Sequence, residues 1–130
     1  MPPERFPPDD PREWLNRARS NLSRAKARIP EVYLEDLCFD AQQAAEKAIK
    51  ALLIKKSVAF PYVHDIAHLL TLLEQTELQI PEPVRRAEDL TRYAVVTRYP
   101  GIAEPVGESH YRDALVSAEA VVRWAEREIG

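Results

Sequence analysis

The sequence has little cysteine, little glycine and no long apolar run, and each shortage excludes a class of protein. Its 130 residues include one cysteine, Cys38, so an intramolecular disulfide or a cysteine-based metal site is excluded. Cys38 falls among apolar residues, and we predict a small core residue. No apolar run approaches the roughly 20 residues of a membrane helix, and the proline-rich start is unlike a signal peptide. A cytoplasmic protein without membrane contact is therefore expected.

The three glycines and the eleven prolines lie outside or at the edges of the periodic apolar segments. Both residue types disfavour helix interiors, so the segments between them are predicted to be helices. No segment shows the sustained alternation of a half-buried strand. The glycine motifs of P-loop and dinucleotide-binding enzymes and of serine hydrolases are also absent. Conventional nucleotide-fold enzymes are excluded on this basis.

Apolar residues at spacings of three and four predict five helices. Their approximate ranges are 10–29, 31–57, a short helix from 65, 81–98 and 108–128. In the first helix we expect an inward stripe of Trp14, Ala18, Leu22, Ala25 and Ile29; in the fourth, Val84, Ala87, Leu90, Ala94 and Thr97. The second helix is the most apolar and is predicted to lie at the centre. The fold is therefore predicted to be all-α, an up-and-down bundle of four main helices plus one short helix.

One domain over residues 10–130 is predicted, after a flexible, proline-rich N-terminus at residues 1–9. The formal net charge is −3 and the pI is about 5.7. A broad basic surface for nucleic acid is therefore not expected, and any phosphate contact must be local.

The run FDAQQAAEKAIKALL, residues 39–53, is similar to the central helix of HEPN proteins (higher eukaryotes and prokaryotes nucleotide-binding). Weaker matches lie at His64-Asp65-Ile66, at Arg98-Tyr99-Pro100, and at Trp14 and Trp124, and the resemblance covers residues 12–129. It implies a helical bundle that forms a homodimer and pairs with a minimal nucleotidyltransferase as a toxin and antitoxin. No metal and no cofactor is implied.

Many HEPN toxins are metal-independent ribonucleases with a signature of an arginine followed, after four to six residues, by a histidine. This sequence departs from that spacing, because eleven residues separate Arg98 from His110, and Arg92 has no histidine within reach. The prolines and glycines between residues 100 and 107 would have to fold His110 back toward Arg98. We keep Arg98 and His110 as the candidate catalytic pair.

Arg98 is the first candidate ligand, since a guanidinium can clamp a phosphate, although a cation at a helix C-terminus also needs no ligand. Lys47 and Lys50 with Glu46 form either a solvated stripe or part of a dimer cleft near Arg98. Further candidate ligand-binding residues are Tyr99, Gln43 and His64. His64 and His68 have metal-ligand spacing but no third ligand, so the sequence favours no metal site.

Three functions remain open at this point. The first is a homodimer that binds nucleotide or RNA phosphate and acts with a nucleotidyltransferase partner. The second is a ribonuclease toxin in which Arg98 orients phosphate and His110 is the general acid or base. The third is an interaction module without a ligand.

Overall fold

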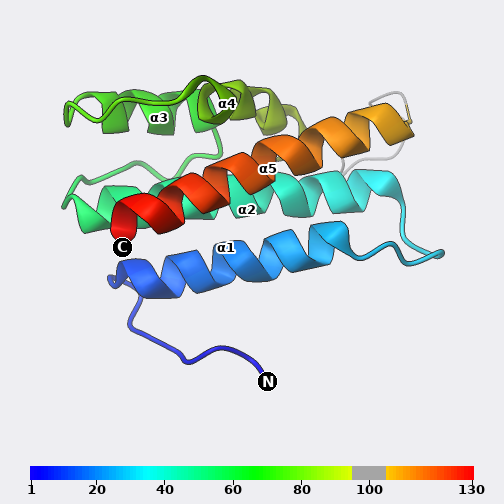
Figure 1. Ribbon diagram of the computed structural model, residues 1–130, viewed down its shortest axis with the longest axis horizontal. Coiled ribbons are helices and arrows are strands. Elements are labelled where there is room, and N and C mark those ends of the chain that lie inside the picture. Colours follow the sequence, from blue (N-terminus) through cyan, green and yellow to red (C-terminus); the bar gives the residue numbers. More distant parts are fainter. Residues whose placement is uncertain (95–104) are drawn as a thin grey trace.

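The computed structural model describes residues 1–94 and 105–130, and every regular element in these ranges is helical. In chain order the elements are α1 (Pro11–Lys26), α2 (Leu34–Lys55), α3 (Ile66–Glu74), α4 (Glu82–Arg85), the 3-10 helix η1 (Arg86–Ala94) and α5 (Glu108–Ile129). The predicted all-α bundle is confirmed. Figure 1 shows α1, α2 and α5 lengthwise beside one another, with α3, α4 and η1 covering the side of this layer away from α1. Within the described ranges no helix is long and apolar enough to cross a membrane.

The start of α1 follows the sequence signals, but its end does not. The Asp10 carboxylate accepts a hydrogen bond from the Arg12 amide, and Pro11 occupies the first helical position. The helix ends at Lys26, short of Pro30, and the chain beyond it is no longer helical. Ile29, predicted to face inward, is therefore half-exposed and outside the helix, while Leu15 takes a core position that was not predicted.

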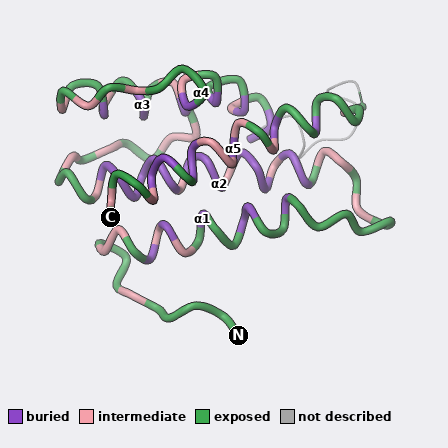
Figure 2. Tube along the Cα trace, viewed as in Figure 1, coloured by how far each residue is buried: buried purple, intermediate pink, exposed green. Residues whose placement is uncertain are grey.

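Helix α2 is the centre of the fold, as predicted, because α1, α3, η1 and α5 all pack against it. Figure 2 shows it as the most continuously buried element. Its alanines allow neighbouring helices to approach closely, and Cys38 is fully buried beside them, which confirms the core position predicted for the thiol. The helix ends where Ser57 takes a positive φ of 57°. The completely buried side chains of its core are Cys38, Ala41, Gln42, Ala44, Ala45, Ala48, Ile49, Ala51 and Leu53.

The predicted fourth helix is divided. One α-helical turn, α4, is followed by the 3-10 turns of η1, and Thr97 and Arg98 lie outside the described residues. The buried residues of this segment recur at intervals of three: Val84, Ala87, Leu90 and Tyr93. A 3-10 helix has three residues per turn, so this interval suits it better than the 3.6-residue turn of an α-helix. Ala94 is buried as well, as predicted.

The first helical turn of α5 is fixed to the end of α1. The Tyr111 hydroxyl is buried and donates a hydrogen bond of 2.5 Å to the Ala25 carbonyl oxygen. Next to it, Arg28 pairs with Glu108 and lies over the Tyr111 ring. These contacts join two segments that are more than eighty residues apart in the chain.

The N-terminal segment lies along α1 through three hydrogen bonds. The Trp14 indole donates to the Pro8 carbonyl at 2.6 Å, the Phe6 amide donates to Glu13, and Asn16 donates to the Glu4 carbonyl. The flexibility expected for residues 1–9 stays a prediction.

Candidate functional site

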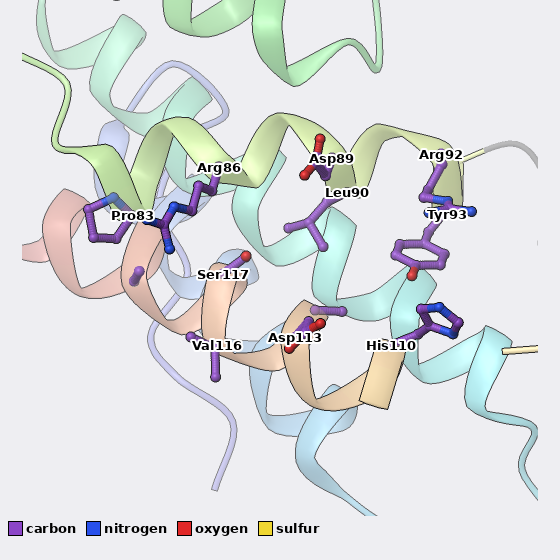
Figure 3. Close-up of a pocket in the computed structure, with 12 residues that line it drawn as sticks. Pro83, Arg86, Asp89, Leu90, Arg92, Tyr93, His110, Asp113, Val116 and Ser117 are labelled. Atoms are coloured by element: carbon purple, nitrogen blue, oxygen red, sulfur yellow. The ribbon is translucent and has the colours of Figure 1, made fainter. Parts of the chain in front are cut away.

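A groove of about 430 Å³ lies between the α4–η1 segment and α5 (Figure 3). We call it the η1–α5 groove. One wall carries Pro83, Arg86, Asp89 and Arg92. These residues are three positions apart, so the 3-10 geometry places one of them on each turn of the same face. The wall therefore presents an alternation of positive, negative and positive side chains.

The opposite wall is the first half of α5. His110, Asp113 and Ser117 line the groove from positions that share one face of an α-helix. Val116 stands at its edge with an exposed fraction of 70%. The groove thus has two arginines, one imidazole and two carboxylates on walls provided by different elements.

Tyr93 connects the groove to the core. Figure 3 shows its ring between Arg92 of η1 and His110 of α5. The Arg92 guanidinium lies 5.6 Å from the centre of this ring. Tyr93 also hydrogen-bonds with the buried Cys38, and burial is the main cause of the raised pKa of both groups, which reaches about 11 for the thiol. Neither group is therefore ionised near neutral pH.

The structure places a second arginine, Arg92, on the same groove as His110. In the sequence Arg92 has no histidine at the signature spacing, but in the fold Arg92 and His110 line the same groove. Arg98 and Tyr99 lie outside the described residues, so their pairing with His110 stays a prediction. His110 sits at the start of α5, where its Nδ1 accepts a 3.4 Å hydrogen bond from the Gly107 amide.

A second polar cluster lies inside the bundle, and it contains three of the predicted ligand-binding residues. We call it the Glu46 network; its members are Gln42, Gln43, Glu46, Lys50 and His64. Glu46 Oε1 accepts from Gln42 at 2.8 Å and lies 3.0 Å from His64 Nδ1, and Oε2 accepts from Lys50 at 2.9 Å. Gln43 donates to Gln42 at 2.7 Å.

Of the two alternatives for this part of α2, the solvated stripe is wrong for Glu46 and Lys50. Glu46 and Lys50 expose only 2% and 4% of their surface. Lys50 is further enclosed by the rings of Trp14, Phe60 and Tyr62, with Nζ 5.5 to 5.9 Å from the ring centres. A buried ion pair gains little net stability over apolar packing, although breaking it is costly. Its main effect here is to fix the side chains that it contacts.

Lys47 belongs to a different cluster at the α1–α2 interface. Its ammonium donates to Asn21 at 2.8 Å, and Asn21 in turn donates to Asp40, which also pairs with Arg24. Burial, aided by the Arg17 charge, lowers the pKa of Lys47. Lys47 is therefore joined to α1 and is not a member of the Glu46 network.

The described residues contain no group of three histidine, cysteine or acidic side chains placed to hold a metal ion. His64 is bound to Glu46, and the neighbouring His68 is exposed. No metal chemistry is derived from this arrangement.

Comparisons with known proteins identify the family. The family model for the HEPN domain matches residues 11–128, almost the whole chain. The chain belongs to the HEPN family. A crystal structure of an archaeal HEPN homologue, ST0689, has 25% sequence identity and a TM-score of 0.73, covering 93% of this chain and 98% of its own. The crystal structure of TT1696 from Thermus thermophilus has 31% identity and a TM-score of 0.79, covering 91% and 97%. Comparison with curated proteins gives no match.

Sequence reasoning missed most of the groove of this HEPN chain. Arg86, Asp89, Asp113 and Ser117 were not candidates, since each is an ordinary polar residue on a helix. The signal that could have found the first wall is the interval of three that joins Arg86, Asp89 and Arg92 in phase with the buried residues. The second wall has no such signal, because its position beside η1 comes from tertiary packing.

We predict that Glu46→Gln destabilises this HEPN chain by about 3–5 kcal/mol, since it leaves the buried Lys50 ammonium without a carboxylate. Combining it with Lys50→Met should recover most of this loss, because no buried charge then remains unpaired. Chemical denaturation of the two single variants and the double variant gives the coupling. Glu82→Gln is the control, since the Glu82–Arg86 pair is exposed and should change stability by less than about 1 kcal/mol. Equal effects of Glu46→Gln and Glu82→Gln would contradict the interpretation.

Proposed function

We propose that this chain is a HEPN protein that binds nucleotide or RNA phosphate in the η1–α5 groove, as a homodimer. The observation that carries the proposal is the gathering of Arg86, Arg92 and His110 around one groove. Arginine suits phosphate because its planar guanidinium forms paired, charge-assisted hydrogen bonds. The net charge of −3 agrees with this local recognition, because a broad electrostatic field is missing.

The acidic side chains of the groove favour a nucleotide over a bare phosphate ion. Asp89 stands between the two arginines on the same wall, and Asp113 faces them from α5. Carboxylates repel phosphate, but they accept hydrogen bonds from ribose hydroxyls and from base amino groups. Six residues of a 3-10 helix separate the Arg86 and Arg92 backbones by ~12 Å. A ligand that places sugar hydroxyls between separated phosphates matches this alternation.

Replacing the groove arginines tests the binding site. Arg92→Ala should weaken binding of a mononucleotide or a short RNA by roughly 10-fold or more, because a charged hydrogen-bond donor is worth about 1.5–3 kcal/mol. Arg86→Ala should also weaken it. Titration calorimetry at two salt concentrations measures the affinity and its salt dependence.

Arg127→Ala is the matched control for the groove variants, since Arg127 is an exposed arginine near the far end of α5. Equal affinities of Arg92→Ala, Arg127→Ala and the unchanged protein would sink the proposal for this groove.

The homodimer is proposed with Val116 at or near its interface. This side chain is exposed by 70% on α5, and the neighbouring groove wall is formed in part by Pro83 and Ala120. A second copy packed against this part of α5 would remove the Val116 side chain from water. HEPN membership supports the dimer, since members of the family commonly dimerise.

We predict that the protein sediments as a dimer at tens of micromolar and that Val116→Asp shifts it toward the monomer, because a carboxylate would be buried in the interface. Glu128→Gln, an exposed position on the same helix, should leave the dimer intact. A monomer in analytical ultracentrifugation of the unchanged protein would reject the homodimer.

The proposed partner is a minimal nucleotidyltransferase, in a toxin–antitoxin module. Support comes from the HEPN resemblance of the central helix, whose FDAQQAAEKAIKALL run lies in α2. Isolation of the protein with a transferase encoded in the adjacent gene would agree with this assignment.

A second candidate function is that of a metal-independent ribonuclease. It is favoured by one observation, namely that His110 and Arg92 line the same groove although their separation in the sequence departs from the ribonuclease signature. Arg92 would hold the scissile phosphate, and His110 would transfer a proton to or from the ribose oxygen. Arg98 stays in this proposal as an alternative phosphate ligand.

For this ribonuclease function we predict that the rate of cleavage of a labelled tRNA pool, measured in the presence of a chelator, falls at least 100-fold in His110→Ala. Arg92→Ala and Arg98→Ala, assayed in parallel, distinguish the arginine that contacts phosphate. If the correctly folded, unchanged protein does not cleave the RNA, the ribonuclease proposal is rejected, whereas the binding proposal is unaffected.

A further inference from the structure

The loop between α2 and α3 arranges aromatic rings over the Glu46 network. Phe60, Tyr62 and His64 alternate along this loop. Trp14 of α1 meets Phe60 edge to face, with the ring centres 6.2 Å apart. Beneath them lies the buried Lys50 ammonium. Trp14 and Phe60 are half-buried and pack against the core, so Tyr62 is the exposed aromatic ring of this cluster.

Tyr62 contributes little to the core, because 92% of its surface is exposed. Two side chains nonetheless lie beside its ring. Lys50 Nζ lies over one face of the ring at 5.8 Å, and the His64 ring packs against it edge-on with the centres 5.8 Å apart. With 92% of the Tyr62 surface exposed, a face of the ring is open to solvent. The result is an exposed aromatic surface beside His64.

His64 presents a hydrogen-bonding atom of fixed direction beside this surface. Its Nδ1 is held 3.0 Å from Glu46 Oε1, and the remaining contacts of that carboxylate are filled by Gln42 and Lys50. The imidazole is therefore oriented by a buried carboxylate, while its edge is still partly exposed. Among the described residues, none hydrogen-bonds with His64 Nε2. Nε2 can thus donate to or accept from a ligand, depending on the tautomer.

We propose that Tyr62 and His64 form a nucleobase-binding site, separate from the η1–α5 groove. The base stacks on the open face of Tyr62, and its polar edge hydrogen-bonds with His64 Nε2. A nucleobase fits because it combines a flat π-face with donors and acceptors at its rim. Phosphate does not fit, because the ammonium at this site, Lys50, is 4% exposed and already bound to Glu46.

The site is tested with ligands that contain a base but no phosphate. Adenosine, guanosine, cytidine and uridine are titrated into the full-length protein, and the ring signals of Tyr62 and His64 are followed by NMR. At least one nucleoside should shift both sets of signals, whereas ribose 5-phosphate should shift neither. Tyr62→Ala should raise the dissociation constant about 5- to 100-fold, since stacking on one aromatic ring contributes that much. Tyr62→Phe should bind within about 3-fold of the unchanged protein, because it keeps the ring.

Tyr33→Ala is the matched control, since Tyr33 is also a well-exposed tyrosine but lies at the start of α2, away from Lys50 and His64. The proposal would be overturned if none of the four nucleosides shifted the NMR ring signals of Tyr62 and His64. It would also be overturned if Tyr62→Ala and Tyr33→Ala bound a nucleoside with equal affinity. A hexamer of adenylate that binds more tightly than adenosine, with the same dependence on Tyr62, identifies single-stranded nucleic acid as the source of the base. Equal affinities identify a free nucleoside or nucleotide. Failure of phosphate binding in the groove leaves the nucleoside results unchanged, because the nucleosides carry no phosphate.

Discussion

The burial of α2 on nearly every side is the constraint on which the rest of the structure depends. Its alanines let α1 and α5 approach, while α3 and η1 cover the remaining surface. A polar side chain on its buried surface must then find its partner inside the protein. Gln42, Glu46 and Lys50 meet this requirement together, because they are four residues apart and form one row along the helix. The same row is linked to the partly exposed side chains of His64 and Gln43.

The parts of the fold that local chemistry determines were predictable from the sequence. Asp10 and Pro11 placed the start of α1, and the apolar run of α2 identified the central helix. The 3-10 conformation of η1 was not predicted, since spacings of three also occur in α-helices and a short segment does not separate the two periods. The burial of Glu46 and Lys50 was missed for a related reason. Charged residues on a helix usually face water, and only the assembled neighbours reveal that these two do not.

The candidate sites were harder to predict because they form between elements distant in the chain. The HEPN resemblance directed attention to Arg98, His110, Glu46 and His64, and two of these prove to be joined by a hydrogen bond. Arg92 and His110 come together because η1 and α5 pack against each other, and separation along the chain says nothing about that distance. Residue spacing along the sequence predicts which side chains share a face of one helix. It does not predict a groove whose walls come from two helices.

Helix α1 contributes no side chain to the η1–α5 groove, yet it holds one wall of it in place. Tyr111, whose hydroxyl is bound to the Ala25 carbonyl oxygen, directly follows His110. The position of His110 on the groove wall is therefore tied to the last turn of α1. A molecule that bound to the outer face of α1 and shifted this helix would displace the α5 wall of the groove through the Tyr111–Ala25 hydrogen bond, without contacting the groove itself.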